Sequence, residues 1–288
     1  MKSREFNEAD PCFPNGAYNG ITNEGFIKCT CGRDNKYCSD NFIKNLFTTD
    51  GMMISGQKII MNTGLTKTID ELFNFAQHNP DVGITSCRRI NPKGRPEREM
   101  AFASPWLIIS WIRAVYKLIN KAKIQKKFPE NEIIWSPDWI AGSVVLIEKE
   151  LFNKIGKWDQ DNFWMYYEDV DLCRKVKLQN KEIALLRNVE LKHAHGGSSR
   201  RNPKTTAITK SEVVTSSHVY IQLHTQGLNR LLLHFAIFID TLLSQLVKIL
   251  FTLPVFWKTS FRANVLVLIA TSKYYMNTPI RRTWKSKK

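Results

Sequence analysis

The chain has 288 residues, of which 43% are hydrophobic and 24% are charged, and this composition excludes a mostly disordered protein. Its 14 Gly and 11 Pro follow no period, which excludes a collagen-like or low-complexity architecture. The formal net charge of +16 predicts an anionic partner, but composition leaves nucleic acid, a lipid surface and phosphorylated substrates open.

Most of this charge lies in the C-terminal part of the chain. Residues 200–288 contain fourteen Lys and Arg but only two acids, Glu212 and Asp240, so they carry +12 of the total +16. A nearly neutral body with a basic tail is typical of a soluble domain that docks onto an anionic surface. Nucleic acid is the disfavoured partner, because the charge lies beside apolar helices and no nucleic-acid-binding motif is present.

Four of the six Cys lie in the first 38 residues, namely Cys12, Cys29, Cys31 and Cys38. The N-terminus shows no apolar run of the length of a secretory signal, so we expect a cytoplasmic protein without disulfides. The spacing of these Cys does not match the paired Cys-x-x-Cys knuckles of zinc sites. Free thiols are therefore the favoured interpretation, and a structural zinc site is the alternative.

In chain order, residues 1–56 lack a sustained hydrophobic period and are expected to form a divergent N-terminal segment of loops, with a short helix near residues 40–47. The pattern then predicts a buried strand over residues 58–61, a helix over 69–77 and a second strand over 82–86. A strand, a helix and a strand at this spacing form a βαβ unit. The expected fold class is therefore α/β, with a mixed or parallel sheet flanked by helices.

Residues 104–128 predict a helix that is both basic and apolar. Arg113, Lys117, Lys121 and Lys123 lie among its apolar residues or just after them. Two interpretations stay open, a surface helix packed on the core and an insertion that faces a membrane.

Further along the chain, the pattern predicts a strand over residues 144–147, a helix over 148–155 and a strand over 182–186. Together with the preceding βαβ unit, these elements are assigned to one α/β core over residues 57–200. The remaining residues, 201–288, are assigned to a basic, amphipathic helical C-terminal region.

Three carboxylates fall within four positions, at Glu168, Asp169 and Asp171, directly after a cluster of aromatic residues. Because like charges repel and partial burial disfavours ionisation, one of them could hold a raised pKa that suits a general base. On a helix, Glu168 and Asp171 share a face that Asp169 does not. The alternative is that these acids open a helix, where they favour the helix dipole and cap free N–H groups.

This part of the chain resembles the second half of a family 2 glycosyltransferase of the GT-A fold, close to the rhamnosyltransferase-like branch. The motifs that carry the resemblance are, in order, Trp139-x-x-Gly142, Phe152-x-x-Ile155-Gly156-x-x-Asp159, Tyr167-Glu168-Asp169-x-Asp171-Leu172-Cys173-x-Lys175 and His193-x-x-Gly196-x-Ser198. Their order, spacing and flanking strands all match. Residues 58–95 extend the resemblance more loosely.

The resemblance implies an inverting transfer of a sugar from a nucleotide-sugar donor to a lipid-linked or polysaccharide acceptor. In that reaction Asp169 is the catalytic base, which takes the proton from an acceptor hydroxyl while its oxygen attacks the anomeric carbon. Glu168 and Asp171 would orient the acceptor or hold the loop. Trp139 and Gly142 would line the acceptor side, because a flat aromatic ring suits the apolar face of a sugar.

On the donor side, the resemblance implies that His193, with His195 beside it, lies near the diphosphate or its metal, a divalent cation such as manganese or magnesium. Two His next to a Gly-Gly-Ser-Ser run after a strand are more typical of a binding site than of a core. The other expected substrate-binding residues are Asp159, Tyr167 and Ser198.

The donor-binding half departs from the family pattern. Enzymes of the family carry an Asp-containing metal motif after a strand, but here the corresponding place holds Asn62-Thr63-Gly64. A divalent ion needs oxygen ligands, and Gly64 offers no side chain. The alternative to an enzyme is therefore a non-catalytic relative that has lost donor binding.

Residues 228–253 are strongly apolar but carry a polar stripe, formed by Arg230, His234, Thr241, Gln245, Lys248 and Thr252. A membrane-spanning helix needs about 20 apolar residues with few charges, so His234, Asp240 and Lys248 favour an interfacial helix instead. A helical hairpin packed against the catalytic body is the alternative. The basic residues within 281–288 would attract anionic lipid head groups, so we expect a protein peripheral to the cytoplasmic face of the membrane.

Overall fold

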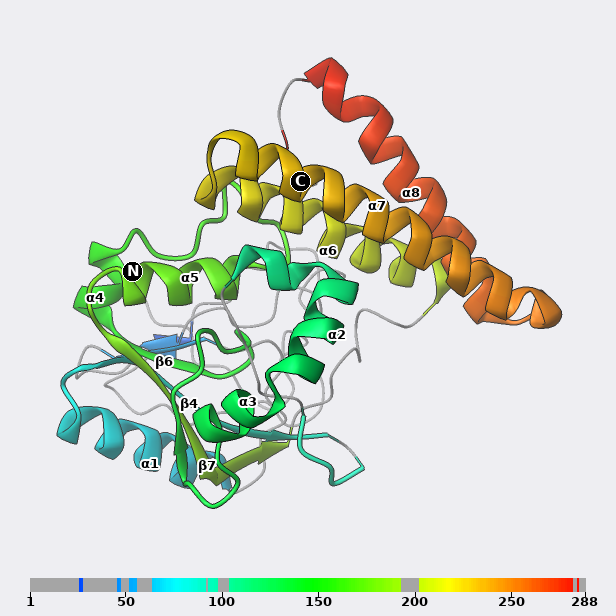
Figure 1. Ribbon diagram of the computed structural model, residues 1–288. Coiled ribbons are helices and arrows are strands. Elements are labelled where there is room, and N and C mark those ends of the chain that lie inside the picture. Colours follow the sequence, from blue (N-terminus) through cyan, green and yellow to red (C-terminus); the bar gives the residue numbers. More distant parts are fainter. Residues whose placement is uncertain are drawn as a thin grey trace. The chain divides into compact units, whose positions relative to one another are not determined.

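The structure, a computed structural model, describes residues 26–27, 46–47, 52–55, 64–91, 93–97, 104–192, 202–281 and 284 (Figure 1). The chain divides into two compact units. The sheet unit comprises the residues up to 102 with 125–157 and 172–195, and the helical unit comprises 103–124, 158–171 and 196–288. The predicted domain limits, after residues 56 and 200, fall outside the described residues and stay a prediction.

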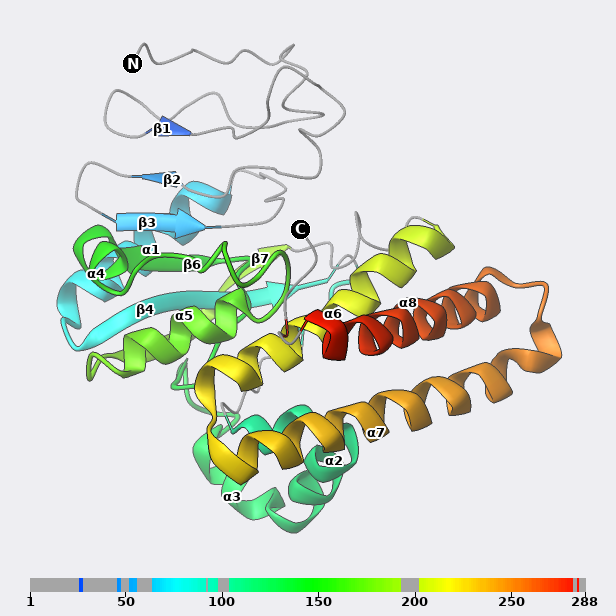
Figure 2. The same ribbon diagram turned by 90° about the horizontal axis from the view of Figure 1, so that it is seen from above.

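A mixed sheet forms the sheet unit, and its described strands lie in the order β1-β2-β3-β6-β4-β7-β5 (Figure 2). They are β1 (Phe26–Ile27), β2 (Leu46–Phe47), β3 (Met52–Ser55), β4 (Val82–Ile90), β5 (Ile134–Trp135), β6 (Val145–Glu148) and β7 (Glu182–Lys192). β4 and β7 pair in parallel, and the other neighbouring pairs are antiparallel. The mixed sheet with its helices confirms the predicted α/β class.

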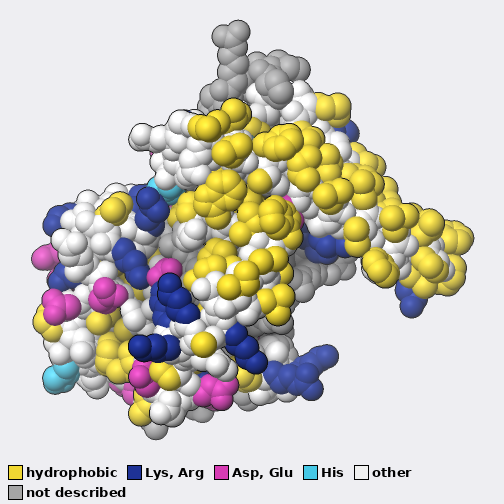
Figure 3. All heavy atoms as spheres, viewed as in Figure 1, with side chains coloured by type: hydrophobic (Ala, Val, Ile, Leu, Met, Phe, Trp, Pro, Cys, Tyr) yellow, Lys and Arg dark blue, Asp and Glu magenta, His cyan; other side chains and the backbone are white. Residues whose placement is uncertain are grey.

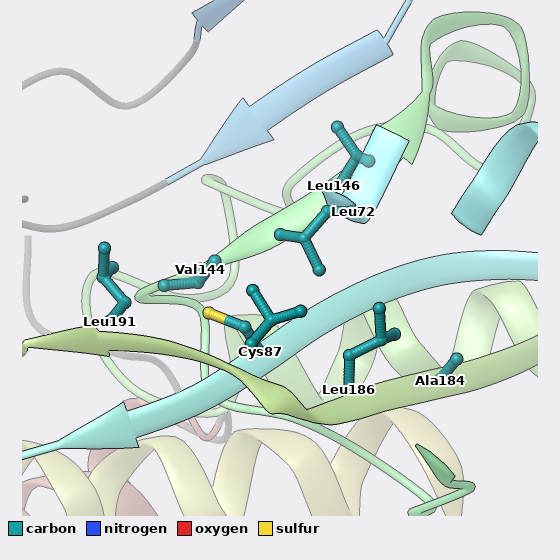
Figure 4. Packing of buried hydrophobic residues seen from close by; sticks show 8 residues of the cluster. Leu72, Cys87, Val144, Leu146, Ala184, Leu186 and Leu191 are labelled. Carbon is teal, nitrogen blue, oxygen red and sulfur yellow. The ribbon is translucent and has the colours of Figure 1, made fainter. Parts of the chain in front are cut away.

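Helix α1 (Gly64–His78) packs on this sheet through its apolar side. Leu72 is only 1% exposed and belongs to a buried hydrophobic cluster (Figure 4). The residues of this cluster come from α1, from the segment that enters β6, and from strands β4, β6 and β7. They are Leu72, Cys87, Val144, Leu146, Ala184, Leu186, Val189 and Leu191. α1 stops before Pro80, because proline disfavours a helical backbone at the residue that precedes it. The helix predicted over 69–77 and the strand predicted over 82–86 are confirmed, and both are longer than predicted.

The helix predicted near residues 40–47 is wrong at its end, because Leu46–Phe47 is strand β2. Its two residues pair in antiparallel register with Ile54 and Met53 of β3. A helix this short is marginal in water, whereas a ladder on an existing sheet edge satisfies the backbone groups at once. The strand predicted over residues 58–61 lies outside the described residues.

Helices α4 (Lys149–Lys154) and α5 (Glu168–Lys177) complete this part of the chain, and α4, β6 and β7 confirm the three elements predicted there. Gly83 in β4 allows the close packing around them. A Cβ at this position would lie 2.6 Å from Val176 Cγ1, 2.8 Å from Lys181 Cβ and 3.0 Å from Leu151 Cδ2. Glycine therefore lets the C-terminal part of α5 approach the sheet closely, which fixes the body of that helix.

The helical unit contains η1 (Pro105–Ile108), α2 (Ser110–Ile119), α6 (Pro203–His224), α7 (Gly227–Thr252), η2 (Leu253–Val255) and α8 (Thr259–Arg281). α6 contacts both α7 and α8, and α7 also packs against α8 (Figures 1 and 2). Asn202 caps α6 by accepting the N–H of Thr205 at 2.8 Å, and Pro203 occupies the start of the helix. α7 confirms the helix predicted over residues 228–253, and Pro254 lies in η2, which ends it.

The basic, apolar stretch over residues 104–128 is helical as predicted but interrupted. Ile109 adopts an extended backbone between η1 and α2, and Asn120 separates α2 from α3 (Lys121–Lys127). The side-chain amide of Asn120 donates to the carbonyl of Tyr116 at 3.0 Å. This bond satisfies one of the backbone acceptors that the end of α2 leaves open.

Candidate active site

The three predicted carboxylates lie in the first turn of α5. This confirms that Glu168, Asp169 and Asp171 open a helix. The N–H of Asp171 donates to the carbonyl of Tyr167 at 2.8 Å and so closes the entry to the helix. The positive end of the helix dipole favours the ionised form of carboxylates at this place, which is compatible with a catalytic role.

The chain enters α5 through a strained backbone. Tyr166 and Tyr167 have φ values of 67° and 65°, so two consecutive residues with side chains adopt the left-handed region. Each such residue costs on the order of 1 kcal/mol, and strain of this kind is concentrated at functional sites. The surroundings must therefore hold this entry in place.

One of these supports comes from α6. Ser216, fully buried, donates its hydroxyl to the carbonyl of Met165 at 2.7 Å, directly before the two strained tyrosines. A second support is aromatic, because the ring of Tyr220 lies 5.6 Å from the ring of Tyr167. α6 thus holds the segment that presents the carboxylates.

Buried Asp171 has a partly buried partner that the sequence alone did not indicate. Its side chain accepts a hydrogen bond from His224, in the last turn of α6, with 2.7 Å between Oδ1 and Nε2. Asp171 is 1% exposed, and the ring of Tyr220 packs on His224 at 4.6 Å. Because the two partners are 53 residues apart, no local pattern pointed to His224.

Asp169 is half-buried, and its Oδ1 accepts the N–H of Val170 at 2.8 Å. Its carboxylate lies close enough to Tyr167 that its charge helps to raise the pKa of that phenol. Burial is the main cause of the raised pKa of Tyr167, the nearby Arg113 opposes it, and Tyr220 adds to it. Tyr167 therefore stays a neutral phenol at physiological pH, able to donate a hydrogen bond.

Asp159 shapes the loop that leads to α5. Its two carboxylate oxygens accept from the backbone N–H and the side-chain amide of Asn162, at 3.0 and 2.8 Å. Its backbone carbonyl accepts the N–H of Phe163 at 3.0 Å. These contacts make Asp159 part of a compact turn.

The remaining predicted residues are distributed differently. The helical unit brings together Asp159, Tyr167, Glu168, Asp169 and Asp171. Trp139 and Gly142 belong to the sheet unit, where both are half-buried. The others, His193, His195 and Ser198, lie outside the described residues.

No group of three or more His, Cys, Asp or Glu able to hold a metal ion occurs among the residues that the structure describes. The N-terminal Cys of the zinc alternative lie outside this part of the chain, and Cys87 and Cys173 are buried free thiols. Gly64, at the place of the expected metal motif, is the first residue of α1. The described residues therefore do not form a cation site.

Comparison with known proteins gives a weak similarity to sugar-transferring enzymes. No protein-family model matches the chain. A segment of 60 residues is 38% identical to the rhamnosyltransferase WbbL of Escherichia coli (strain K12) and covers 21% of this chain and 22% of that protein. The aligned segment thus spans about a fifth of the relative.

Among solved structures, the chain shows similarity to a mannosyltransferase from Pyrobaculum calidifontis, PcManGT, in complex with GDP-Man and Mn2+. The similarity covers 77% of this chain and 61% of that one, with a TM-score of 0.38 and 10% sequence identity. The sequence similarity to the rhamnosyltransferase gives weak support for a glycosyltransferase-like function.

Proposed function

We propose that this protein is a glycosyltransferase of the GT-A, family 2 type, which moves a sugar from a nucleotide-sugar donor to a lipid-linked or polysaccharide acceptor with inversion. The observation that carries the proposal is the entry to α5. There the motif Tyr167-Glu168-Asp169-x-Asp171 opens a helix, follows a strained turn and is supported by α6. The similarity to a rhamnosyltransferase supports the same reaction class.

Asp169 is the proposed general base. It accepts the proton of an acceptor hydroxyl while a lone pair of that oxygen attacks the anomeric carbon. The bond from this carbon to the nucleoside diphosphate breaks, and the bonding electrons leave with the diphosphate. A correctly placed base contributes about 10²–10⁴ to the rate of such a step.

The other residues of the motif would position the reactants. Buried Asp171, held by His224, fixes the first turn of α5 and thereby the direction of Asp169. Glu168 and the neutral phenol of Tyr167 would orient acceptor hydroxyls through hydrogen bonds. Trp139 and Gly142 stay proposed on the acceptor side.

On the donor side, His193 and His195 stay proposed. Asp159 and Ser198 stay proposed as substrate-binding residues of either side. A divalent cation bound to the diphosphate would neutralise charge on the leaving group. His193, the residue proposed to lie near this cation, is outside the described part of the chain. Manganese dependence is therefore an arm of the binding experiment.

A lipid-linked acceptor would require work at a membrane surface, so the proposal includes a peripheral location on the cytoplasmic face. A second candidate is a non-catalytic relative that has lost donor binding. The observation in its favour is Gly64, which opens α1 where the family carries a metal-binding carboxylate.

Calorimetric titration of the detergent-solubilised chain with UDP-sugars and dTDP-sugars, with and without manganese, tests the two candidates. Micromolar binding supports the enzyme, and dependence on manganese would show that a cation takes part. Absence of binding by a sample with native circular dichroism would favour the non-catalytic relative.

A further inference from the structure

The polar and apolar sides of α7 are arranged the opposite way round from those of a helix on a soluble protein. The residues that α7 buries are Leu233, His234, Ile237, Thr241 and Gln245, of which three are polar. Its exposed residues include nine large apolar ones: Leu228, Leu231, Leu232, Phe235, Leu243, Leu246, Val247, Leu250 and Phe251. Exposure of such side chains to water costs about 25 cal/mol per Å², so this face needs an apolar environment.

The polar side of α7 packs inside the helical unit, against α6 and α8. The neighbouring helices also bury small polar residues, namely Thr209, Ser211, Thr215, Ser216 and Ser217 of α6 and Asn264, Thr271 and Thr278 of α8. His234 Nδ1 lies 2.7 Å from His218 Nδ1 of α6, and His218 Nε2 lies 3.0 Å from the hydroxyl of Tyr275 in α8. The apolar side of α7 is thereby left facing outwards.

Helix α2 extends this apolar surface. It has no buried residue, and it exposes Trp111, Val115, Leu118 and Ile119. Figure 3 shows hydrophobic side chains gathered along α7 and over α2. The surface therefore consists of two helices that are more than a hundred residues apart in the sequence.

Asp240, in the middle of α7, joins the two helices. Its carboxylate accepts the N–H of Ser110 at 3.1 Å and the hydroxyl of the same residue at 2.6 Å, and so caps the start of α2. Close by, Trp106 Nε1 donates to Asn229 Oδ1 at 3.1 Å. The acid that disfavours a membrane-spanning helix is thus engaged by α2.

Basic residues accompany the apolar surface almost without acids. In α2, α7, η2 and α8 together, Asp240 is the single acidic residue. Exposed Arg113, Lys248, Lys258 and Arg262 lie on the same elements or on the short connection after η2. A surface that is apolar and basic at once matches an anionic lipid bilayer, where apolar burial and attraction to head groups act together.

We propose that the exposed apolar faces of α7 and α2, with Leu253, Phe256 and Trp257 at the tip after α7, form one docking surface that rests on an anionic bilayer with α7 along the membrane plane. We call this set of residues the docking face; all three tip residues are exposed. The inference goes beyond the proposed sugar transfer, because it rests on the surface and charge of the helical unit and not on the carboxylates of α5.

By length and composition α7 could cross a membrane, and among the described helices it alone passes that weak criterion. It would be about 39 Å long. A crossing would place the polar side of α7, together with α6 and its Lys204, Lys210 and Glu212, at hydrocarbon depth. Charged groups are costly there, so the in-plane arrangement is favoured.

A second copy of the chain is the competing occupant. Pairing two docking faces would bring two basic surfaces together, and Asp240 is the single acidic residue of α2, α7, η2 and α8. Like charges across an interface oppose association. An anionic bilayer supplies the missing negative charge.

Vesicle flotation of the full chain tests the proposal, with vesicles of phosphatidylcholine alone or mixed with phosphatidylglycerol. The wild type should float with the anionic vesicles and less with the neutral ones. A Leu250→Glu, Phe251→Glu variant should lose at least about tenfold in partitioning, because two exposed anchors become charged. Leu118→Glu in α2 should lose a smaller factor.

The matched control is Ile133→Glu, Leu178→Glu, which makes the same charge change at two exposed apolar residues of the sheet unit. This variant should float like the wild type, and native circular dichroism confirms that each variant is folded. Three outcomes would overturn the proposal: equal losses in both double variants, a dimer dispersed by the α7 variant without vesicle binding, or bound protein that neither high salt nor alkaline carbonate releases. Because flotation measures no transfer, failure here would remove the proposed peripheral location but leave the proposed sugar transfer untouched.

Discussion

The sheet unit and the helical unit bury opposite kinds of side chain. In the sheet unit, apolar side chains of α1, β4, β6 and β7 meet in a common cluster, as in any water-soluble α/β domain. In the helical unit, hydroxyl, imidazole and carboxylate groups fill much of the interior while α7 and α2 present large apolar side chains outside. Since burial is driven by transfer out of water, the contrast supports the proposed docking of the helical unit on a bilayer.

The contrast also bears on the proposed site. The carboxylates of α5 belong to a helix whose body packs on the sheet through Gly83, but whose first turn is held by α6. The first turn of α5, which carries the proposed base, is thus held within the helical unit. The four predictions that follow compare equivalent changes in the two units, from the largest expected effect to the smallest.

The same Asp→Asn change, made once in each unit, should give the largest difference between the units, and this difference is in kcat/KM for sugar transfer. Asp169→Asn keeps the shape of the side chain but removes the base, so kcat/KM for sugar transfer should fall by about 10²–10⁴. Asp81→Asn, at an exposed residue before β4, should leave it unchanged. Steady-state assays on the two folded variants measure this, and normal turnover in Asp169→Asn would refute the assignment of the base.

Removal of leucine side chains should distinguish the two kinds of apolar surface. Leu72→Ala leaves a cavity in the sheet cluster and should lower the free energy of unfolding by about 2–5 kcal/mol. Leu250→Ala, at a 65% exposed residue of α7, should change it by less than about 0.5 kcal/mol. Urea unfolding followed by circular dichroism measures both, and comparable losses would show that the α7 face is covered within the protein.

Loss of the buried bond to Asp171 should have an intermediate effect. His224→Ala removes a donor to a buried carboxylate and should cost about 1.5–3 kcal/mol of stability. His224→Gln, whose amide can donate from a similar distance, should recover part of this loss. His78→Ala, at an exposed residue of α1, is the control and should be close to neutral.

Acidification should have the smallest effect of the four, a loss of stability that arises in the helical unit. Burial, with a contribution from Arg230, lowers the pKa of His234 from 6.5 to about 4, and burial also lowers the pKa of His218. Between pH 6.5 and about 4, these histidines bind protons in the unfolded chain but stay neutral in the folded chain. The free energy of unfolding should therefore fall as the pH drops through this range.

Thermal unfolding at neutral pH and within this window should show a decrease in Tm of several degrees. His234→Asn keeps a polar partner for His218 but does not titrate, so it should flatten this dependence. His78→Asn should preserve it. An unchanged pH profile in His234→Asn would assign the effect to other groups.

Local patterns were sufficient to locate most elements. Hydrophobic periodicity and helix-ending or strand-ending residues predicted α1, β4, β6, α4 and α7. The residues that define an amphipathic helix or a buried strand are neighbours in the sequence, so a local pattern is enough. The same reasoning placed a helix where β2 lies, because strand pairing with β3 depends on residues elsewhere in the chain. The interruptions at Ile109 and Asn120 were also missed, because no Gly or Pro marks either break between residues 106 and 128.

The candidate site was predictable only in part. The order of motifs located the carboxylates of α5, but the contact from His224 to Asp171 and the cap from Asp240 to Ser110 join residues 53 and 130 positions apart. The polar stripe on α7 was predicted as well. The direction in which this stripe faces was not predicted, because a polar stripe alone does not show which side of a helix packs against the protein.

The bond from Asp240 to Ser110 also constrains how this chain can change in length. One residue inserted or deleted between Gly227 and Asp240 would turn Asp240 by about 100° around the axis of α7 and carry it away from the start of α2. Substitutions in this half of the helix leave the angle unchanged. Related chains should therefore differ in sequence but not in length over residues 227–240, and gaps in their alignment should fall beyond Asp240, towards the tip at η2.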